Sequence, residues 1–356
     1  MKNSTLLNKV LLTFTDGFKE HREDLSAVML TPEKHLWFGS DETSTIERLS
    51  YINANHFGEH KQFRVAEFID LPAPEEEEID IEGIEYSDSY LWIIGSHSWK
   101  RKKPKLDKSD IKNIQRLAKV ASEPNRYILA RIPLVNGELC KSSCPHPEDA
   151  NMQLTAAKLR LTESTNILME VLADDPHLGF FVTAKIPGKD NGFDIEGIAV
   201  HQNRIFLGLR GPVLRGWAVI LEIEVELLQT GLLTLKPIVK TGQCYKKHFV
   251  FLNGLGIRDL HLAGEDLLIL AGPTMDLDGP VQVYRLHVNP CLQDDVLHYP
   301  EYVQDIPFGN RDDHAEGITL FEDISGIPSL LVVYDSPANH RLVSDDSVIA
   351  DVFKLG

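Results

Sequence analysis

The sequence predicts an all-β fold, a five-bladed β-propeller, because two features repeat along it. The first is a short polar signature that opens an apolar β-type run at Asp24–Val28, Asp80–Ile84, Asp194–Ile198, Gly256–Leu260 and His314–Ile318. The second is another hydrophobic run about ten residues after each signature, ending in a small or polar turn. A strand-rich unit repeated at this period is typical of a β-propeller.

The spacing of the signatures sets the number of blades. Their third residues lie 56, 114, 62 and 58 residues apart, and the interval through the chain ends back to the first is 66. One interval is about twice the others, so it holds either a hidden blade or an insertion. Its composition favours an insertion at residues 100–178, which gives five four-stranded blades, with six as the alternative.

The insertion combines charge with helical patterns. Residues 100–108 are rich in lysine and lack strand character, and Ser109 then caps a run with apolar residues at helical spacing, Ile111, Ile114, Leu117 and Ala118. A second helix is predicted over 164–173. The apolar runs Tyr127–Leu134 and Phe180–Ile186 are expected to be the outer strands of the second blade.

The two ends of the chain are predicted to close the ring. Leu6–Phe14 is a strand-like run without a partner of its own, and the last blade, which ends at Val352 and Phe353, lacks an outer strand. Pairing these segments removes two open edges. The whole chain, 1–356, is therefore expected to form a single β-propeller domain.

Composition restricts the classes of partner. The net charge of −17 argues against nucleic acid, because phosphate binding needs a dominant positive face. The chain has no run of about 18 apolar residues and no apolar signal-peptide core, so we expect a cytoplasmic protein without a membrane partner. The basic run Lys100–Lys105 is either a solvated loop or a contact for an acidic partner or a phosphate, and the insertion is a candidate site for a protein partner.

The third residue of each signature carries the functional interest, because the first strands of propeller blades line the central channel. Three carboxylates, a hydroxyl and a guanidinium should converge there, from Ser26, Glu82, Glu196, Arg258 and Glu316. Like charges a few ångströms apart repel strongly. One remedy is a bound Ca²⁺ or another divalent cation, with Ser26, Glu82, Glu196 and Glu316 as ligands. The other is Arg258 paired with two carboxylates, beside a protonated third group or water.

The turns after the second strands should lie on the same face as the signatures and form the channel mouth. There Arg210 and Arg215 either hold a small anionic ligand or only brace their loop. His97 is a general base or ligand, or else a hydrogen-bonded turn histidine. Asp335 contacts substrate or caps its own turn. The candidate catalytic residues are Glu196, His97 and Arg210, and the candidate substrate-binding residues are Arg210, Arg215, Arg258 and Asp335.

Several of these motifs together resemble a known bacterial family. They are Gly95-Ser96-His97-Ser98, Ile195–Ile198 followed by Leu207–Pro212, Gly256–Leu260 and Leu270–Pro273, and they look like the family catalogued as domain of unknown function family 3616. The resemblance implies a propeller and no particular activity.

A more distant similarity is to five-bladed calcium-dependent apyrases, whose axial metal is held by Ser and Glu side chains, one per blade. It implies calcium at Ser26, Glu82, Glu196 and Glu316. Arg258 departs from that pattern, because a guanidinium cannot ligate a cation.

Three classes of function follow. The first is a metal-dependent hydrolase of anionic phosphoesters or related esters, in which Arg210 and Arg215 hold the anion and His97 or a glutamate moves protons. The second is a non-catalytic ligand-binding or protein-interaction scaffold, favoured because the sequence has no Gly-x-Ser-x-Gly, His-Glu-x-x-His or Gly-Lys-Ser/Thr motif. The third is a lactonase-like sugar-acid hydrolase, by fold analogy alone.

Overall fold

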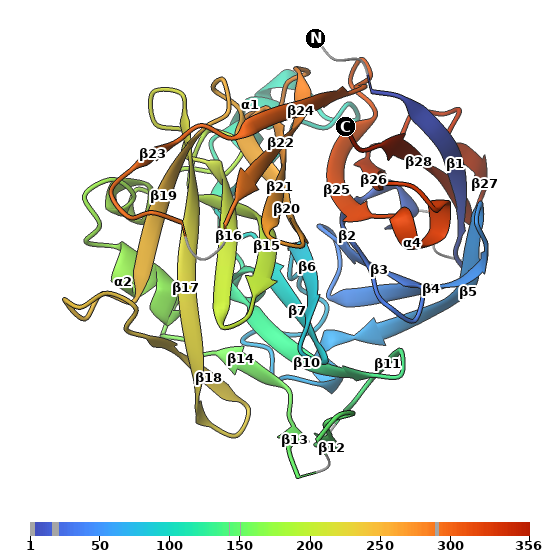
Figure 1. Cartoon of the computed structure of the whole chain (residues 1–356). Helices are drawn as coiled ribbons and strands as arrows, with labels where there is room; N and C mark the ends of the chain where they lie inside the picture. Colours follow the sequence, from blue (N-terminus) through green and yellow to red (C-terminus); the bar gives the residue numbers. More distant parts are fainter. Residues whose placement is uncertain (1–3, 16–20, 142, 150, 289–291) are drawn as a thin grey trace.

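A computed structural model describes residues 4–15, 21–141, 143–149, 151–288 and 292–356. By antiparallel pairing alone, most strands belong to five groups, and two short parallel contacts join neighbouring groups into larger sheets (Figure 1). The first group is β2 (Leu25–Leu30), β3 (His35–Ser40), β4 (Thr45–Asn53) and β5 (His56–Arg64). The second is β6 (Ile81–Ser87), β7 (Tyr90–Gly95), β10 (Leu129–Val135) and β14 (Ala157–Leu159).

The other three groups complete the arrangement. The third is β15 (Asp194–His201), β16 (Arg204–Gly211), β17 (Trp217–Gln229), β18 (Leu232–Lys236) and β19 (Tyr245–Phe251). The fourth is β20 (Gly256–Ala263), β21 (Asp266–Gly272), β22 (Val281–His287) and β24 (Glu301–Ile306). The fifth is β25 (His314–Leu320), β26 (Ser329–Asp335), β28 (Ser347–Lys354) and β1 (Leu6–Thr13).

The first strands of the groups contact one another in a closed ring. β2 contacts β6, β6 contacts β15, β15 contacts β20, β20 contacts β25, and β25 contacts β2. The remaining strands of each group lie progressively farther from this ring (Figure 1). The chain is therefore all-β with the radial arrangement of a propeller.

The apolar core lies between neighbouring groups. Five clusters of buried apolar side chains each join two successive groups, and the last joins the fifth group to the first. Trp37 of β3, for example, belongs to the same apolar cluster as Ile81 of β6, whereas the adjacent Phe38 belongs to the cluster that contains Leu331 of β26. Successive residues of a strand point to opposite faces, so each sheet is apolar on both faces.

The two chain ends meet as the sequence predicts. β1 pairs antiparallel with β28, from Leu6 opposite Phe353 to Thr13 opposite Ser347. β1 also pairs in parallel with β5 through Leu11 and Leu12. The fifth group therefore takes its outer strand from the start of the chain.

The insertion agrees with the sequence in three places and differs in one. The helices α1 (Asp110–Leu117) and α2 (Ile167–Leu172) and the strand β10 lie where they are predicted. The prediction of a strand over Phe180–Ile186 is wrong, because the helix α3 (Gly179–Thr183) lies there and β14 is the fourth strand instead. A short apolar run has the same appearance in a strand and in a buried helix, so periodicity alone does not separate them.

The remaining elements are short. They are the strands β8 (Lys100–Arg101), β9 (Val120–Ala121), β11 (Glu138–Leu139), β12 (Cys144–Pro145), β13 (Gln153–Leu154), β23 (Leu297–His298) and β27 (Leu342–Ser344), the helix α4 (Glu322–Ser325), and the 3-10 turns His21–Glu23, Val65–Glu67 and Pro124–Tyr127. None of the helices in the described residues has the length and apolar character needed to cross a membrane.

Candidate functional site

All five predicted axial residues occupy the same irregularity of their sheets. In each group, the register between the first and second strands shifts across the third residue of the signature, at Leu25/Ala27, Ile81/Gly83, Ile195/Gly197, Ile257/Asp259 and Ala315/Gly317. The residues inside these shifts are Ser26, Glu82, Glu196, Arg258 and Glu316. A bulge re-aims the side chain of its extra residue. The repeated signature is therefore the sequence of a repeated bulge.

The residue after each bulge explains why the signature contains glycine. A Cβ atom on Gly197 would lie 2.7 Å from the backbone nitrogen of Leu260, on the neighbouring inner strand. In the fourth group this position is Asp259, whose carboxylate accepts hydrogen bonds of 2.8 Å from the backbone amides of Leu260 and Ile318. At Gly197, the inner strands of neighbouring groups therefore pack backbone against backbone. At Asp259, a carboxylate connects them by accepting a hydrogen bond from Ile318 of the next inner strand.

Buried ion pairs connect the axial residues. Glu196 lies 2.5 Å from Arg210 through one carboxylate oxygen and 3.1 Å from Arg258 through the other. Arg258 also pairs with Glu316, and Arg210 with Asp194. All five side chains are nearly fully buried. We call this set, Asp194, Glu196, Arg210, Arg258 and Glu316, the hub.

The hub matches the second of the two arrangements considered from the sequence, in which Arg258 pairs with two carboxylates. Glu82 is the third carboxylate, and no ion pair or hydrogen bond joins its side chain to any residue that the structure describes. Burial, followed by the charges of Glu196 and Asp80, holds the pKa of Glu82 well above its ordinary value. The Ser26 hydroxyl donates a hydrogen bond to the backbone carbonyl of Ile81. Protonation of Glu82 would relieve the repulsion.

The side chains of the hub do not fit a calcium ion in this arrangement. Both oxygens of Glu196 and one of Glu316 already face guanidinium groups. Across the described ranges, no three or more His, Cys, Asp or Glu side chains are grouped so as to hold a metal. Calcium at Ser26, Glu82, Glu196 and Glu316 stays a prediction, and no step proposed below depends on it.

Further carboxylates surround the hub at the start of the inner strands. Asp80 pairs with Arg126, which also lies 2.8 Å from Glu78. Burial, with the charges of Glu42 and Asp335, raises the pKa of Asp24 to about 7. Sequence reasoning used only the third position of the signature and missed the first, where Asp24, Asp80 and Asp194 recur.

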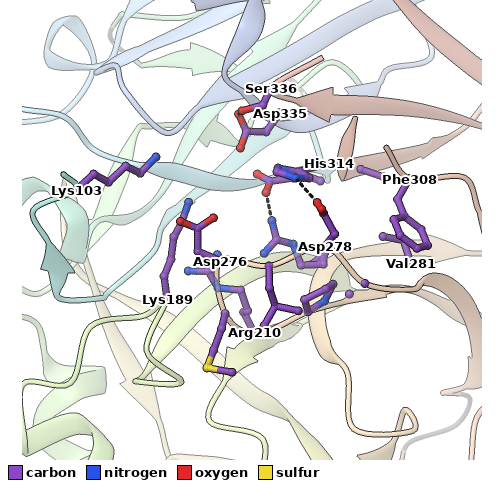
Figure 2. Close-up of a pocket in the computed structure, with 18 residues that line it drawn as sticks. Lys103, Lys189, Arg210, Asp276, Asp278, Val281, Phe308, His314, Asp335 and Ser336 are labelled. Atoms are coloured by element: carbon purple, nitrogen blue, oxygen red, sulfur yellow. Dashed lines mark hydrogen bonds and ion pairs between the residues drawn. The ribbon is translucent and has the colours of Figure 1, made fainter. Parts of the chain in front are cut away.

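A pocket of about 90 Å³ opens beside the hub (Figure 2). Arg210, Arg258 and Glu316 contribute to its wall from the hub side. Lys103 and Lys189 extend their ammonium groups toward it (Figure 2). The lining also contains the carboxylates of Asp276, Asp278 and Asp335 and the imidazole of His314. Cations and carboxylates therefore share one small opening.

The structure brings some predicted mouth residues into this pocket and leaves others outside. Arg210, Arg258 and Asp335 line it, and Asp335 accepts a hydrogen bond of 3.0 Å from the Ser336 hydroxyl. Arg215 is exposed in a turn with a positive φ of 51° and is not part of the lining. The prediction that Arg215 holds substrate beside Arg210 therefore does not apply to this pocket.

His97 is a turn histidine and not a mouth residue. It is buried, its Nδ1 lies 2.7 Å from the carbonyl oxygen of Gly95, and its Nε2 lies 2.7 Å from the Asn166 side-chain nitrogen. The carbonyl accepts from Nδ1–H, so Nε2 accepts from Asn166 and the ring is neutral. Burial lowers the pKa of His97 to about 4. With both nitrogens engaged inside the protein, the structure does not bring His97 to the mouth, and a role for it in moving protons stays a prediction.

Two lysines of the pocket were not singled out from the sequence. Lys103 belongs to the basic run of the insertion, and Lys189 lies in the loop before β15. Neither lies within ion-pair distance of a carboxylate among the residues that the structure describes. Gly188 permits this loop to run against the hub, because a Cβ there would lie within 2.1 Å of the Asp194 carboxylate. The only signal in the sequence was the basic run itself.

Comparison with known proteins places the chain in a family. The family model described as protein of unknown function (DUF3616) matches residues 24–351. The chain belongs to the DUF3616 family. The resemblance seen in the sequence motifs is thereby confirmed.

Similarity of this DUF3616 chain to other proteins is remote. No curated protein matches it. The PQQ-bound aldose sugar dehydrogenase from Streptomyces coelicolor is 11% identical, with 99% of this chain and 98% of that chain covered and a TM-score of 0.39. Virginiamycin B lyase from Staphylococcus aureus is 12% identical, with 92% and 67% covered and a TM-score of 0.34. At this level neither similarity bears on function.

Proposed function

We propose that the pocket beside the hub binds a small anion, a carboxylate or a phosphate. The observation that carries the proposal is that Lys103 and Lys189, from two distant segments, reach the same pocket and pair with no described carboxylate. Arg210 and Arg258, in contrast, already face carboxylates of the hub. An ammonium group is a compact point charge that suits either kind of anion.

The carboxylates of the pocket narrow the class of ligand. Asp276 and Asp335 line the same opening as the two lysines. A ligand with several negative charges would be repelled by them, whereas a monoanion with hydroxyl groups can meet the lysines through its charge and donate hydrogen bonds to the carboxylates. A hydroxylated carboxylic acid or a phosphate diester that carries free hydroxyl groups satisfies both requirements.

Titration of the full chain with inorganic phosphate and with gluconate, followed by calorimetry and thermal unfolding, tests this proposal. Lys103→Met and Lys189→Met should each weaken binding by about tenfold, the loss expected for one charge-assisted contact. Lys102→Met is the matched control, because Lys102 is an exposed neighbour of Lys103 outside the pocket. Absence of binding in the wild-type protein, or an equal loss in the control, would reject the proposal.

A second candidate function is hydrolysis of an ester in the bound anion. It is favoured by Asp24, whose pKa of about 7 suits a general acid or base at neutral pH. Asp24 forms a backbone bridge with Asp335, which lines the pocket. Glu196, the catalytic candidate from the sequence, is less suitable, because both of its oxygens face arginines.

Chromogenic carboxylic and phosphoric esters of nitrophenol would detect such an activity. Asp24→Asn should abolish turnover and leave anion binding within about twofold, because a residue that only transfers a proton contributes little to ground-state binding. Turnover retained in the Asp24→Asn protein would exclude Asp24 from catalysis and leave the binding role alone.

We also infer that the propeller has five blades. Support comes from the ring of five first strands and from the five apolar clusters between neighbouring groups. On this count the third and fourth strands of the second blade are β10 and β14, and residues 100–121 and α2 are additions to that blade.

A further inference from the structure

A basic projection stands out on a protein that is otherwise acidic. Residues 100–121 contain nine basic and two acidic residues, a net charge of +7 in a chain whose net charge is −17. They comprise β8, α1, β9 and the connections between them. We call residues 100–121 the basic projection. The surface of the basic projection is distinct from the anion pocket, and the two share only Lys103.

The basic projection holds its shape through its own contacts. β8 pairs with β9, and the backbone amide of Lys102 donates a hydrogen bond of 3.1 Å to the carbonyl of Lys119. The Asn113 side chain accepts a bond of 2.9 Å from the backbone amide of Lys105 and donates one of 3.0 Å to its carbonyl. Arg116 donates a bond of 2.7 Å to the carbonyl of Lys103. The connection 102–109 is thereby fastened to α1 as a preformed unit.

Large apolar side chains of the projection face solvent. Leu106 has a relative exposure of 109%, Ile111 of 72% and Ile114 of 67%. No residue of α1 is buried, although its apolar residues follow helical spacing. A helix with an apolar stripe normally packs that stripe against its own protein. Here the stripe lacks such cover, and lysines outside the anion pocket flank it at positions 102, 105, 112 and 119, all exposed.

We propose that the basic projection docks on an anionic lipid surface. Leu106, Ile111 and Ile114 would enter the boundary between headgroups and acyl chains, while the flanking lysines meet lipid phosphates. Charge complementarity supports an anionic partner, because this is a concentrated positive region on a negative protein. The expectation of no membrane partner rested on the absence of a spanning segment, and surface docking does not require one.

The shape of the projection favours lipid over an acidic protein groove. The exposed apolar side chains are spread over a connection and a helix, so no single helical face carries them all. α1 has eight residues, about two turns, which is short for a helix bound in a groove. A lipid surface accepts an irregular apolar tip, because the acyl boundary deforms around it.

Sedimentation of the full-length protein with vesicles tests the proposal. We expect binding to vesicles of equal parts phosphatidylcholine and phosphatidylglycerol, release at high salt, and no binding to phosphatidylcholine alone. Ile114→Asp should weaken binding by about tenfold or more without lowering the melting temperature, because its side chain is exposed. Leu228→Asp is the matched control, since Leu228 is 52% exposed on β17, away from the projection.

Reversing the charge of two lysines in the basic projection tests the electrostatic part of the proposal independently. Lys105→Glu combined with Lys112→Glu should abolish anionic vesicle binding, whereas Lys240→Glu, also at an exposed position, should leave most of it. Failure of the wild-type protein to bind anionic vesicles at low salt would overturn the proposal. So would equal binding by the Ile114→Asp and Leu228→Asp proteins. Saturable binding to a soluble polyglutamate but not to vesicles would replace the lipid with an acidic polypeptide.

Discussion

Arg258 and Glu316 form an ion pair between the neighbouring inner strands β20 and β25, with both side chains nearly fully buried. The same guanidinium lies 3.1 Å from Glu196 on β15. One side chain therefore links the first strands of three successive groups. We therefore expect Arg258 to stabilise the ring of first strands.

Arg258→Met should destabilise the protein by about 3–5 kcal/mol, because it leaves Glu316 buried without its cation. Denaturant unfolding measures the change. Arg285→Met is the control, since Arg285 is 29% exposed and its pairs with Asp266 and Glu301 lie at 3.6 Å; its loss should stay below about 1 kcal/mol. A similar loss in both variants would contradict the special role of Arg258.

Arg258→Ser should convert the hub into a calcium-binding site. The change removes the guanidinium that faces Glu196 and Glu316 and supplies a hydroxyl, as Ser26 does at the equivalent bulge. The carboxylates of Glu82, Glu196 and Glu316 and the hydroxyls of Ser26 and the introduced serine are suitable oxygen ligands for Ca²⁺. We expect calcium to raise the melting temperature of this variant and not that of the wild type. If EDTA destabilises purified wild-type protein, the calcium prediction made from the sequence holds instead.

Gly197→Ala should be strongly destabilising, because the new methyl group would meet the backbone of Leu260, which cannot move aside like a side chain. Overpacking of this kind typically costs about 1–3 kcal/mol, and a backbone clash belongs at the upper end. Gly58→Ala serves as the comparison. Its nearest new contacts lie at 3.6 Å, so stability should change little or rise. Thermal unfolding distinguishes the two outcomes.

Glu85→Gln should make stability less sensitive to alkaline pH. Burial raises the pKa of Glu85 from 4.5 to about 8, so the folded protein keeps this proton while the unfolded chain loses it near pH 4.5. Rising pH therefore favours unfolding between these two values, and Gln removes the effect. Relative to wild type, the unfolding free energy of the variant should rise from pH 5 to pH 8, by up to about 4 kcal/mol. Glu76→Gln, at an exposed position, should show no such trend.

The sequence predicts the inner ring well because its information is local and repeated. Each signature fixes a bulge within one strand pair, so Glu82, Glu196 and Arg258 could be aligned by spacing alone. The close approach of neighbouring strands leaves its own mark as glycine, at Gly197 for instance. The exception at Asp259 has no local signal, since its partner Ile318 is 59 residues away.

The mouth was harder to predict, because its residues come from irregular connections. His97 lies in a turn that resembles an active-site motif, yet its ring is fixed by Asn166, a residue 69 positions away that also caps α2. Lys103 and Lys189 reach one pocket only through the path of two long connections. Such paths depend on tertiary contacts and not on strand periodicity, so the spacing of residues carries no information about them.

Pairing of β1 with β28 also imposes an order on biosynthesis. Among the strands that the structure describes, β1 leaves the ribosome first, whereas its antiparallel partner β28 is the last of them to be made. Until then the nascent chain has unsatisfied edges at both ends, and such edges attract other chains. Because β5 is synthesised early, its short parallel contact with β1 can hold the first strand against the ring before β28 is made. A chaperone that covers the incomplete ring would have its largest effect on this protein in the interval before β28 emerges.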